Sequence, residues 1–66
     1  MSIEVNTEKV KWIEGETVSE LLKRMNFVYP MLVIRMNGTV IPRPRYPETE
    51  IEDGAVLEIL HLESGG

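Results

Sequence analysis

The sequence contains no cysteine, which excludes disulfide bonds, thiolate catalysis and cysteine-based metal sites. It contains one histidine, His61, and no Ser/His/Asp set can be assembled around it; a lone histidine in a strand is typical of a structural role. A metal site needs several clustered ligands, and the carboxylates of residues 48–53 match no calcium-loop spacing. We therefore expect no catalytic side chains, no metal and no bound cofactor.

Glycine-rich phosphate loops, extended basic patches and long apolar runs are also missing. The net charge is −4, and beyond Arg43 and Arg45 no basic cluster suggests nucleic-acid binding. No apolar stretch reaches the roughly 20 residues that span a bilayer, and the first residues do not resemble a signal peptide. With 66 residues, the chain predicts one small domain without a deep substrate pocket, in the cytoplasm and away from membranes.

The N-terminal part shows the period of two that marks half-buried strands. Ile3 and Val5 alternate with polar residues, and so do Val10 and Trp12. The polar residues 6–8 between them predict a hairpin turn.

A helix is expected next. Thr17 followed by Glu20 is a capping box, and Val18, Leu21, Leu22 and Met25 have the spacing of one apolar helix face. The pattern fades near Asn26. The opposite, exposed side is expected to carry Glu16, Ser19, Glu20, Lys23 and Arg24.

The second half predicts three strands. Residues 31–36 form an apolar run interrupted by Arg35, and Asn37-Gly38 indicates a type I′ turn into a return strand at 39–41. Three prolines make residues 42–50 an irregular connection that can hold one 3₁₀ turn. The last strand is expected at 55–62, with Leu57 and Ile59 on the core face.

The element order is therefore β-β-α-β-β-β, an α+β arrangement in which one main helix covers a sheet. Placing the last strand centrally beside the first gives a mixed sheet and the β-grasp, or ubiquitin-like, fold. We expect residues 1–62 to form this domain and residues 63–66 to form a flexible C-terminal tail.

The tail ends in Ser64-Gly65-Gly66, and this is the candidate functional segment. Two glycines in the last two places arise by chance in roughly one chain in 200. Glycine lacks Cβ, so its backbone can pass through a narrow channel and bring a terminal carboxylate to chemistry inside another protein. The expected working group is the carboxylate of Gly66, with Gly65 and Ser64 threaded behind it.

An ordered set of short motifs extends over the whole chain. The motifs are Gly15-Glu16-Thr17-Val18, Glu20-Leu21-Leu22, residues 33–38, Val40-Ile41-Pro42-Arg43, Asp53-Gly54, Leu57-Glu58-Ile59 and Gly65-Gly66. With this set the chain resembles the ThiS/MoaD family of ubiquitin-like sulfur carrier proteins, and ThiS of thiamine biosynthesis more than MoaD. One departure is Tyr46, near a position where the family often has Trp, with unusual prolines on either side.

The resemblance implies a protein co-substrate and not an enzyme. A ThiF-like enzyme, which binds the ATP, would adenylate Gly66. Sulfur from a cysteine desulfurase-type donor would then give a thiocarboxylate, which an acceptor such as thiazole synthase would consume. The carrier itself is expected to be a monomer.

Docking to these enzymes needs a surface. If Leu57 and Ile59 face the helix, the alternate residues of the last strand face the open side of the sheet. These apolar residues with acidic neighbours form the expected docking site. Its members are Val56, Glu58, Leu60, Leu62 and Glu63.

Other functions remain open from the sequence. Gly66 could be conjugated to lysines of target proteins, as in a ubiquitin-like modifier. Sulfur could instead serve molybdopterin synthesis, tRNA thiolation or cysteine synthesis. A third class is an interaction module whose tail is inert.

Overall fold

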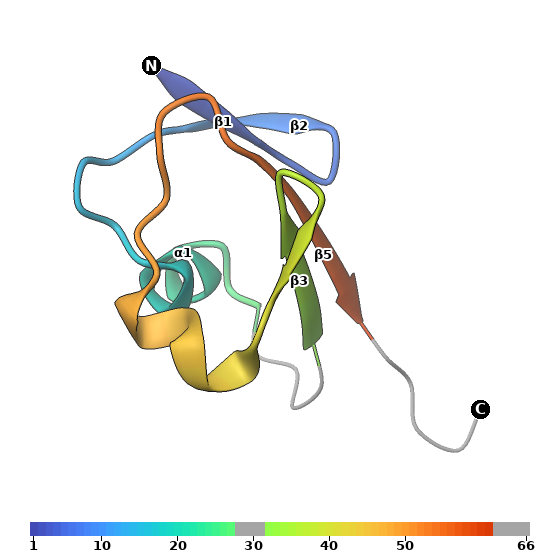
Figure 1. Ribbon diagram of the computed structural model, residues 1–66. Coiled ribbons are helices and arrows are strands. Elements are labelled where there is room, and N and C mark those ends of the chain that lie inside the picture. Colours follow the sequence, from blue (N-terminus) through green and yellow to red (C-terminus); the bar gives the residue numbers. More distant parts are fainter. Residues whose placement is uncertain (28–31, 62–66) are drawn as a thin grey trace.

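The computed structural model describes residues 1–27 and 32–61. They form a five-stranded sheet with the strand order β2-β1-β5-β3-β4 and a helix, α1, on one of its faces (Figure 1). β5 lies in the centre, parallel to β1 and antiparallel to β3. The predicted mixed sheet, its element order and the central position of the last strand are confirmed.

The first two strands, β1 (Ser2–Val5) and β2 (Glu8–Lys11), form the predicted antiparallel hairpin. Glu8 already pairs with Val5, so the loop of this hairpin contains only Asn6 and Thr7. Both loop residues have positive φ. β2 ends one residue before Trp12. The indole N–H of Trp12 donates to the carbonyl oxygen of Ile51 at 2.8 Å and ties this end of the hairpin to the segment before β5.

Helix α1 (Val18–Arg24) begins at the predicted capping box. The backbone N–H of Glu20 donates to Thr17 Oγ1, and the backbone N–H of Thr17 donates to the Glu20 carboxylate at 2.9 Å. Val18 and Leu21 are completely buried, as the apolar spacing indicates. The capping box therefore predicted the start of the helix correctly. The apolar spacing predicted correctly which side of the helix is buried against the sheet.

The expectation that Glu16 lies on the exposed side of the helix is wrong. Glu16 precedes the helix N-cap, and only 8% of the residue is exposed. Its carboxylate is buried because Arg24, in the last helical turn, reaches back and neutralises it. The periodicity of a helix does not extend to a residue outside that helix, so the pattern misassigned this side chain.

The second hairpin joins β3 (Leu32–Met36) to β4 (Thr39–Ile41) through Asn37 and Gly38. Both turn residues have positive φ, as a type I′ turn requires. The proline-containing segment then forms the 3₁₀ helix η1 (Arg43–Glu48). Tyr46 in η1 is buried, and its hydroxyl donates to the carbonyl oxygen of Leu32.

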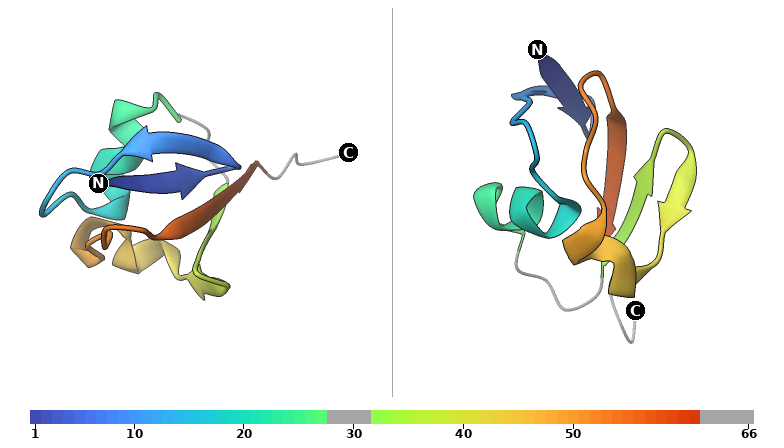
Figure 2. Two further views of the ribbon diagram at one scale, coloured as in Figure 1. Left: turned by 90° about the horizontal axis from the view of Figure 1, so that it is seen from above. Right: turned by 60° about the vertical axis from the view of Figure 1, so that its left-hand side comes forward.

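β5 (Val56–His61) follows the predicted turn at Asp53-Gly54 and completes the sheet. Figure 2 shows α1 and η1 together on one face of the sheet, so no helix within the described residues covers the other face. Within the described residues, no helix is long and apolar enough to cross a membrane. The core lies between the sheet and the two helices, and its fully buried side chains are Val5, Val18, Leu21, Ile34 and Leu57.

Candidate functional site

The uncovered sheet face carries the first part of the expected docking site. Leu57 and Ile59 are buried, whereas Val56 and Leu60 are 43% and 52% exposed. Alternate residues of a strand point to opposite faces, so the predicted register of β5 is confirmed for residues 56–60. The other members, Leu62 and Glu63, lie outside the described residues, as do Ser64, Gly65 and Gly66.

An ion pair lies in the middle of this face. In the sheet register Arg35 of β3 is opposite Glu58 of β5, and the guanidinium donates to the Glu58 carboxylate at 2.8 Å. The two side chains are 44% and 46% exposed, so the pair adds at most about 1 kcal/mol to stability. Its position on a surface with exposed apolar neighbours is better suited to recognition than to stabilisation.

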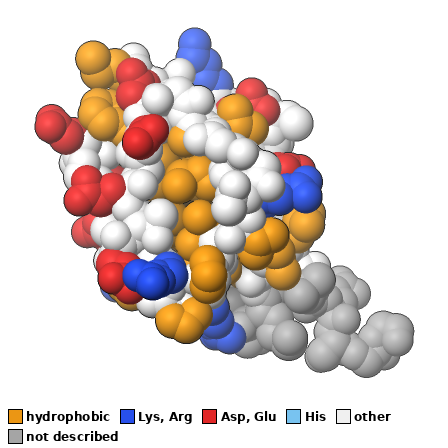
Figure 3. Space-filling model, viewed as in Figure 1, with side chains coloured by type: hydrophobic (Ala, Val, Ile, Leu, Met, Phe, Trp, Pro, Cys, Tyr) orange, Lys and Arg blue, Asp and Glu red, His pale blue; other side chains and the backbone are white. Residues whose placement is uncertain are grey.

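Two further residues belong to this face and were not assigned to it from the sequence. Val40 of β4 is opposite Arg35 in the register and 56% exposed. Arg35 interrupts an otherwise apolar strand, and that interruption was the available signal for a solvent-facing position. In Figure 3, hydrophobic side chains are visible beside basic and acidic groups over the part of the sheet that contains β3, β4 and β5.

A shallow hollow of about 430 Å³ adjoins β5 on the side of the first hairpin. Glu4, Asn6 and Thr7 line it from β1 and its turn, opposite Val56 and Leu60 of β5. Its surface is mostly apolar, and Glu4 and Glu58 are its acidic lining residues. It is a surface depression that suits contact with another protein more than enclosure of a small molecule.

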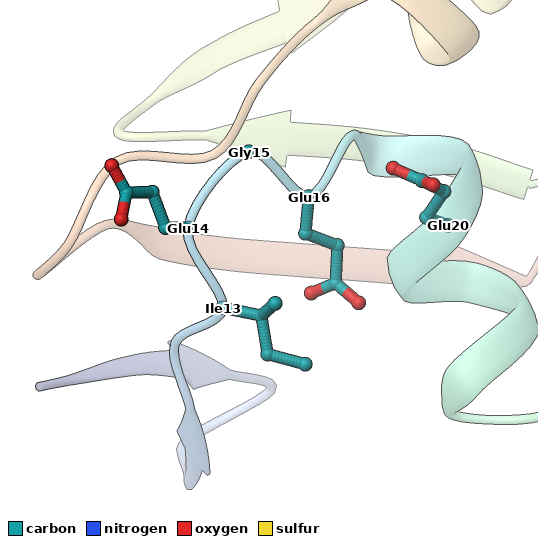
Figure 4. Close-up of a pocket in the computed structure, with 5 residues that line it drawn as sticks. All are labelled: Ile13, Glu14, Gly15, Glu16 and Glu20. Carbon is teal, nitrogen blue, oxygen red and sulfur yellow. The ribbon is translucent and has the colours of Figure 1, made fainter.

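A second hollow, of about 170 Å³, is lined by Ile13, Gly15 and the three acidic residues Glu14, Glu16 and Glu20. Figure 4 shows that Glu14 points away from Glu16. Glu16 is held by Arg24, and Glu20 belongs to the capping box. The carboxylates of Glu16 and Glu20 therefore stabilise the start of the helix.

The carboxyl of Glu20 has a lowered pKa. The main cause is the hydrogen bond that it accepts from the backbone N–H of Thr17, followed by the bond with the Thr17 hydroxyl. This is the ordinary consequence of a capping box. Within residues 1–27 and 32–61, no three or more His, Cys, Asp or Glu side chains are arranged so that they could hold a metal ion.

His61 ends β5 and lies opposite Leu32 of β3 in the sheet register. This is the strand position that the sequence assigned to it. His61 is the last residue of β5, and the chain continues from it toward Gly66.

Comparison with known proteins gives three agreeing results. The model of the ThiS family matches residues 2–66. The sulfur carrier protein ThiS of Bacillus subtilis (strain 168) is 31% identical over 65 residues, which cover 97% of this chain and 98% of that protein. Both alignments extend over essentially the whole chain.

Solved structures agree as well. The crystal structure of a thiamine biosynthesis protein (ThiS) from Geobacter metallireducens is 27% identical, with a TM-score of 0.81 and full coverage of both chains. A solution structure from the same organism, also described as a thiamine biosynthesis protein, is 30% identical, with a TM-score of 0.77, covering all of this chain and 88% of that one. The fold is therefore the β-grasp fold of these proteins, and the chain is a member of the ThiS family.

Proposed function

We propose that this protein is a sulfur carrier whose terminal Gly66 carboxylate is activated and converted to a thiocarboxylate, for use in thiazole formation during thiamine biosynthesis. One observation carries the proposal: the family match extends to residue 66 and so includes Gly65-Gly66. The relative from Bacillus subtilis is named a sulfur carrier protein, and the structural relatives are described as thiamine biosynthesis proteins.

The proposed chemistry takes place on the terminus, inside partner enzymes. The Gly66 carboxylate attacks the α-phosphate of ATP bound by a ThiF-like enzyme, and pyrophosphate leaves. The terminal sulfur of a cysteine persulfide, generated by a desulfurase-type donor, attacks the acyl adenylate, and AMP leaves. A thiol then cleaves the acyl disulfide, which gives the thiocarboxylate and a disulfide on the donor side.

In this scheme the chain is a co-substrate, and its own residues present the terminus. The chain has no cysteine, which fits a carrier that holds sulfur on its main-chain end. Glycines at 65 and 66 add no Cβ where an enclosing channel is narrowest. The ATP requirement and the absence of disulfides fit a cytoplasmic monomer that forms transient complexes.

We assign docking to the open sheet face, with the adenylating enzyme as its occupant. Val56 and Leu60 are exposed and Glu58 is half-exposed on β5, the strand after which the chain continues to Gly66. Leu62 and Glu63 follow β5 in the sequence. A partner bound there is close to the start of the reacting segment. Arg35 and Val40 join this surface from the neighbouring strands.

The test is intact and peptide mass spectrometry of the native protein from its own cells. A mass increase equal to replacement of one oxygen by sulfur at Gly66 is the expected result. A Gly-Gly remnant on lysines of other proteins would instead establish a protein modifier. An unmodified carboxylate, with ATP, a sulfur donor and the cognate activating enzyme present, would leave only an interaction module.

The acceptor is tested separately. The thiocarboxylate form is incubated with purified thiazole synthase, and sulfur incorporation into thiazole is measured. Sulfur transfer to an acceptor of molybdopterin synthesis, tRNA thiolation or cysteine synthesis, without transfer to thiazole synthase, would support the proposed role as a sulfur carrier. It would contradict the proposed pathway. A variant lacking Gly66 is the control, and it should transfer no sulfur to any acceptor.

A further inference from the structure

The central strand β5 extends beyond the strand that pairs with it on one side. The parallel ladder with β1 contains the pairs Glu4↔Val56 and Val5↔Leu57. β1 ends at Val5, and the chain then turns away at Asn6 and Thr7. No β1 residue in strand conformation is therefore opposite Ile59, two residues further along β5.

The side chain of Asn6 takes the place of that missing strand residue. Its Oδ1 accepts from the backbone N–H of Ile59 at 2.8 Å, and its Nδ2 donates to the Ile59 carbonyl oxygen at 3.1 Å. A side-chain amide offers the same donor and acceptor as a peptide group, so it can continue the ladder. The backbone N–H of Asn6 also donates to the Leu57 carbonyl oxygen at 3.0 Å, which gives Asn6 three bonds to β5.

The conformation of Asn6 makes this geometry possible. Its φ is 49°, in the left-handed region that Asn tolerates better than most residues. The turn thus reverses the chain and aims the side-chain amide at β5. Alanine and serine lack a side-chain amide, so they cannot provide both the donor and the acceptor for Ile59. They also tolerate positive φ less well than asparagine.

We propose that Asn6 is a positioning residue for the Gly66 carboxylate. The inference rests on the proposed function, because it assumes that Gly66 reacts in a partner's active site. Gly66 follows His61, the last residue of β5 that pairs with β3, by five residues, which can extend over at most about 18 Å. β3 pairs with this end of β5 on one side, and Asn6 binds Ile59 on the other side. By completing the hydrogen bonds of Ile59, Asn6 fixes the direction of the strand end from which the segment to Gly66 starts, relative to the docked domain.

A second asparagine provides a matched control. Asn37, in the other hairpin turn, also has positive φ, and its Oδ1 accepts from the backbone N–H of Val56 at 2.9 Å. Its backbone N–H donates to the Val56 carbonyl oxygen at 2.8 Å. Asn6 and Asn37 therefore bind β5 in similar ways. Asn37 binds Val56, the first residue of the strand, whereas Asn6 binds Ile59, which is closer to the end that leads to Gly66.

The experiment compares Asn6→Gly with Asn37→Gly. Glycine accepts positive φ, so both turns keep their backbone while each loses its side-chain bonds. In the free protein, amide hydrogen exchange at Ile59 should become about tenfold faster in Asn6→Gly, as expected for lost hydrogen bonds. The exchange at Val56 should become faster in Asn37→Gly instead.

Function is measured as ATP–pyrophosphate exchange with the cognate ThiF-like enzyme, at a temperature where both variants are folded. Asn6→Gly should lower kcat about tenfold, because the terminus is misplaced. KM should change less than about twofold: Asn6 lines the hollow beside β5, but its amide is bonded to Ile59, and the docking residues of β5 are unchanged. Asn37→Gly should leave kcat unchanged. If Asn6→Gly does not fold, Asn6→Asp, which keeps the acceptor for Ile59 N–H but loses the donor, is measured in its place and should lower kcat relative to wild type by less than tenfold.

The outcomes separate the two proposals. Wild-type protein that supports no exchange contradicts the proposed function itself. An active wild type, with faster exchange at Ile59 but unchanged kcat in Asn6→Gly, overturns the positioning role alone. Equal kcat losses in Asn6→Gly and Asn37→Gly would also overturn it, because they would trace the effect to general loosening of β5.

Discussion

The carboxylate of Glu16 holds the guanidinium of Arg24 through two hydrogen bonds of 2.9 Å. The same guanidinium donates to the carbonyl oxygen of Lys11 at 2.8 Å. Glu16 is 8% exposed and Arg24 29% exposed. This pair therefore joins the end of β2, the start of α1 and the last turn of α1. It neutralises Glu16, which is the one buried charged residue among residues 1–27 and 32–61.

Arg24→Ala should lower the free energy of unfolding by about 3 kcal/mol, because it leaves a buried carboxylate without its partner. The measurement is urea denaturation followed by the fluorescence of Trp12, the single tryptophan. Lys23→Ala, at the adjacent exposed position, is the control and should change the free energy of unfolding by less than about 0.5 kcal/mol. A similar loss of unfolding free energy in the two variants would show that the Glu16–Arg24 ion pair contributes no more to stability than an exposed lysine.

Much of the fold could be predicted from sequence because its determinants are local. Thr17 and Glu20 mark the helix start within four residues, and Asn37-Gly38 specifies its turn by the φ values it requires. The alternation of Leu57 and Ile59 with exposed neighbours fixed which face of β5 is buried. In each case one short segment contained the whole signal.

The parts that were not predicted depend on residues far apart in the chain. The burial of Glu16 requires Arg24 to reach back over the helix, and the role of Asn6 requires Ile59, 53 positions away. Arg35 joined the open face only when the register placed it opposite Glu58. No periodicity within one segment carries such information. The proposed reacting terminus, by contrast, was predicted from sequence, and it lies outside the described residues.

Thr7 occupies the left-handed region with φ of 69°, where its branched Cβ is unfavourable. Thr7→Gly should therefore raise the free energy of unfolding by about 0.5–1 kcal/mol, the relief of strain being partly offset by the greater entropy of unfolded glycine. Thr39→Gly is the matched control, since Thr39 lies in β4 without positive φ. It should lower the free energy of unfolding, and destabilisation in both variants would argue that Thr7 is not strained.

The capping box predicts a pH dependence. The bond from the Thr17 backbone N–H holds the pKa of Glu20 below its ordinary value of 4.5. A carboxyl with a lowered pKa in the folded state stabilises the protein above its unfolded pKa, and this contribution is lost as the pH falls through the folded pKa. The stability advantage of wild type over Glu20→Gln should therefore be present at pH 6 and shrink as the pH falls below 4.5.

The measurement combines carboxyl NMR titration of Glu20 with urea denaturation of both proteins across this pH range. Glu52→Gln, at an exposed carboxyl outside the helix, is the control for the loss of one surface charge. A Glu20 pKa at or above 4.5 would contradict the capping argument.

Leu60→Asp tests the open face as the docking surface for the adenylating enzyme. Leu60 is 52% exposed, so the substitution should change the free energy of unfolding by less than about 0.5 kcal/mol. A charge in the apolar part of an interface should raise KM for ATP–pyrophosphate exchange by about tenfold or more. Ile13→Asp is the control, because Ile13 is also exposed, at 39%, but belongs to the loop after β2.

The kinetic pattern separates docking from positioning. Docking affects the encounter between the two proteins and so acts on KM, whereas loss of the Asn6 bonds to Ile59 acts after docking and so acts on kcat. Unchanged kinetics in folded Leu60→Asp would remove β5 from the interface. A matching increase of KM in Ile13→Asp would mean that added negative charge, and not the open face, weakens the complex. The increase confined to Leu60→Asp is the result that would place the enzyme on the strand leading to Gly66.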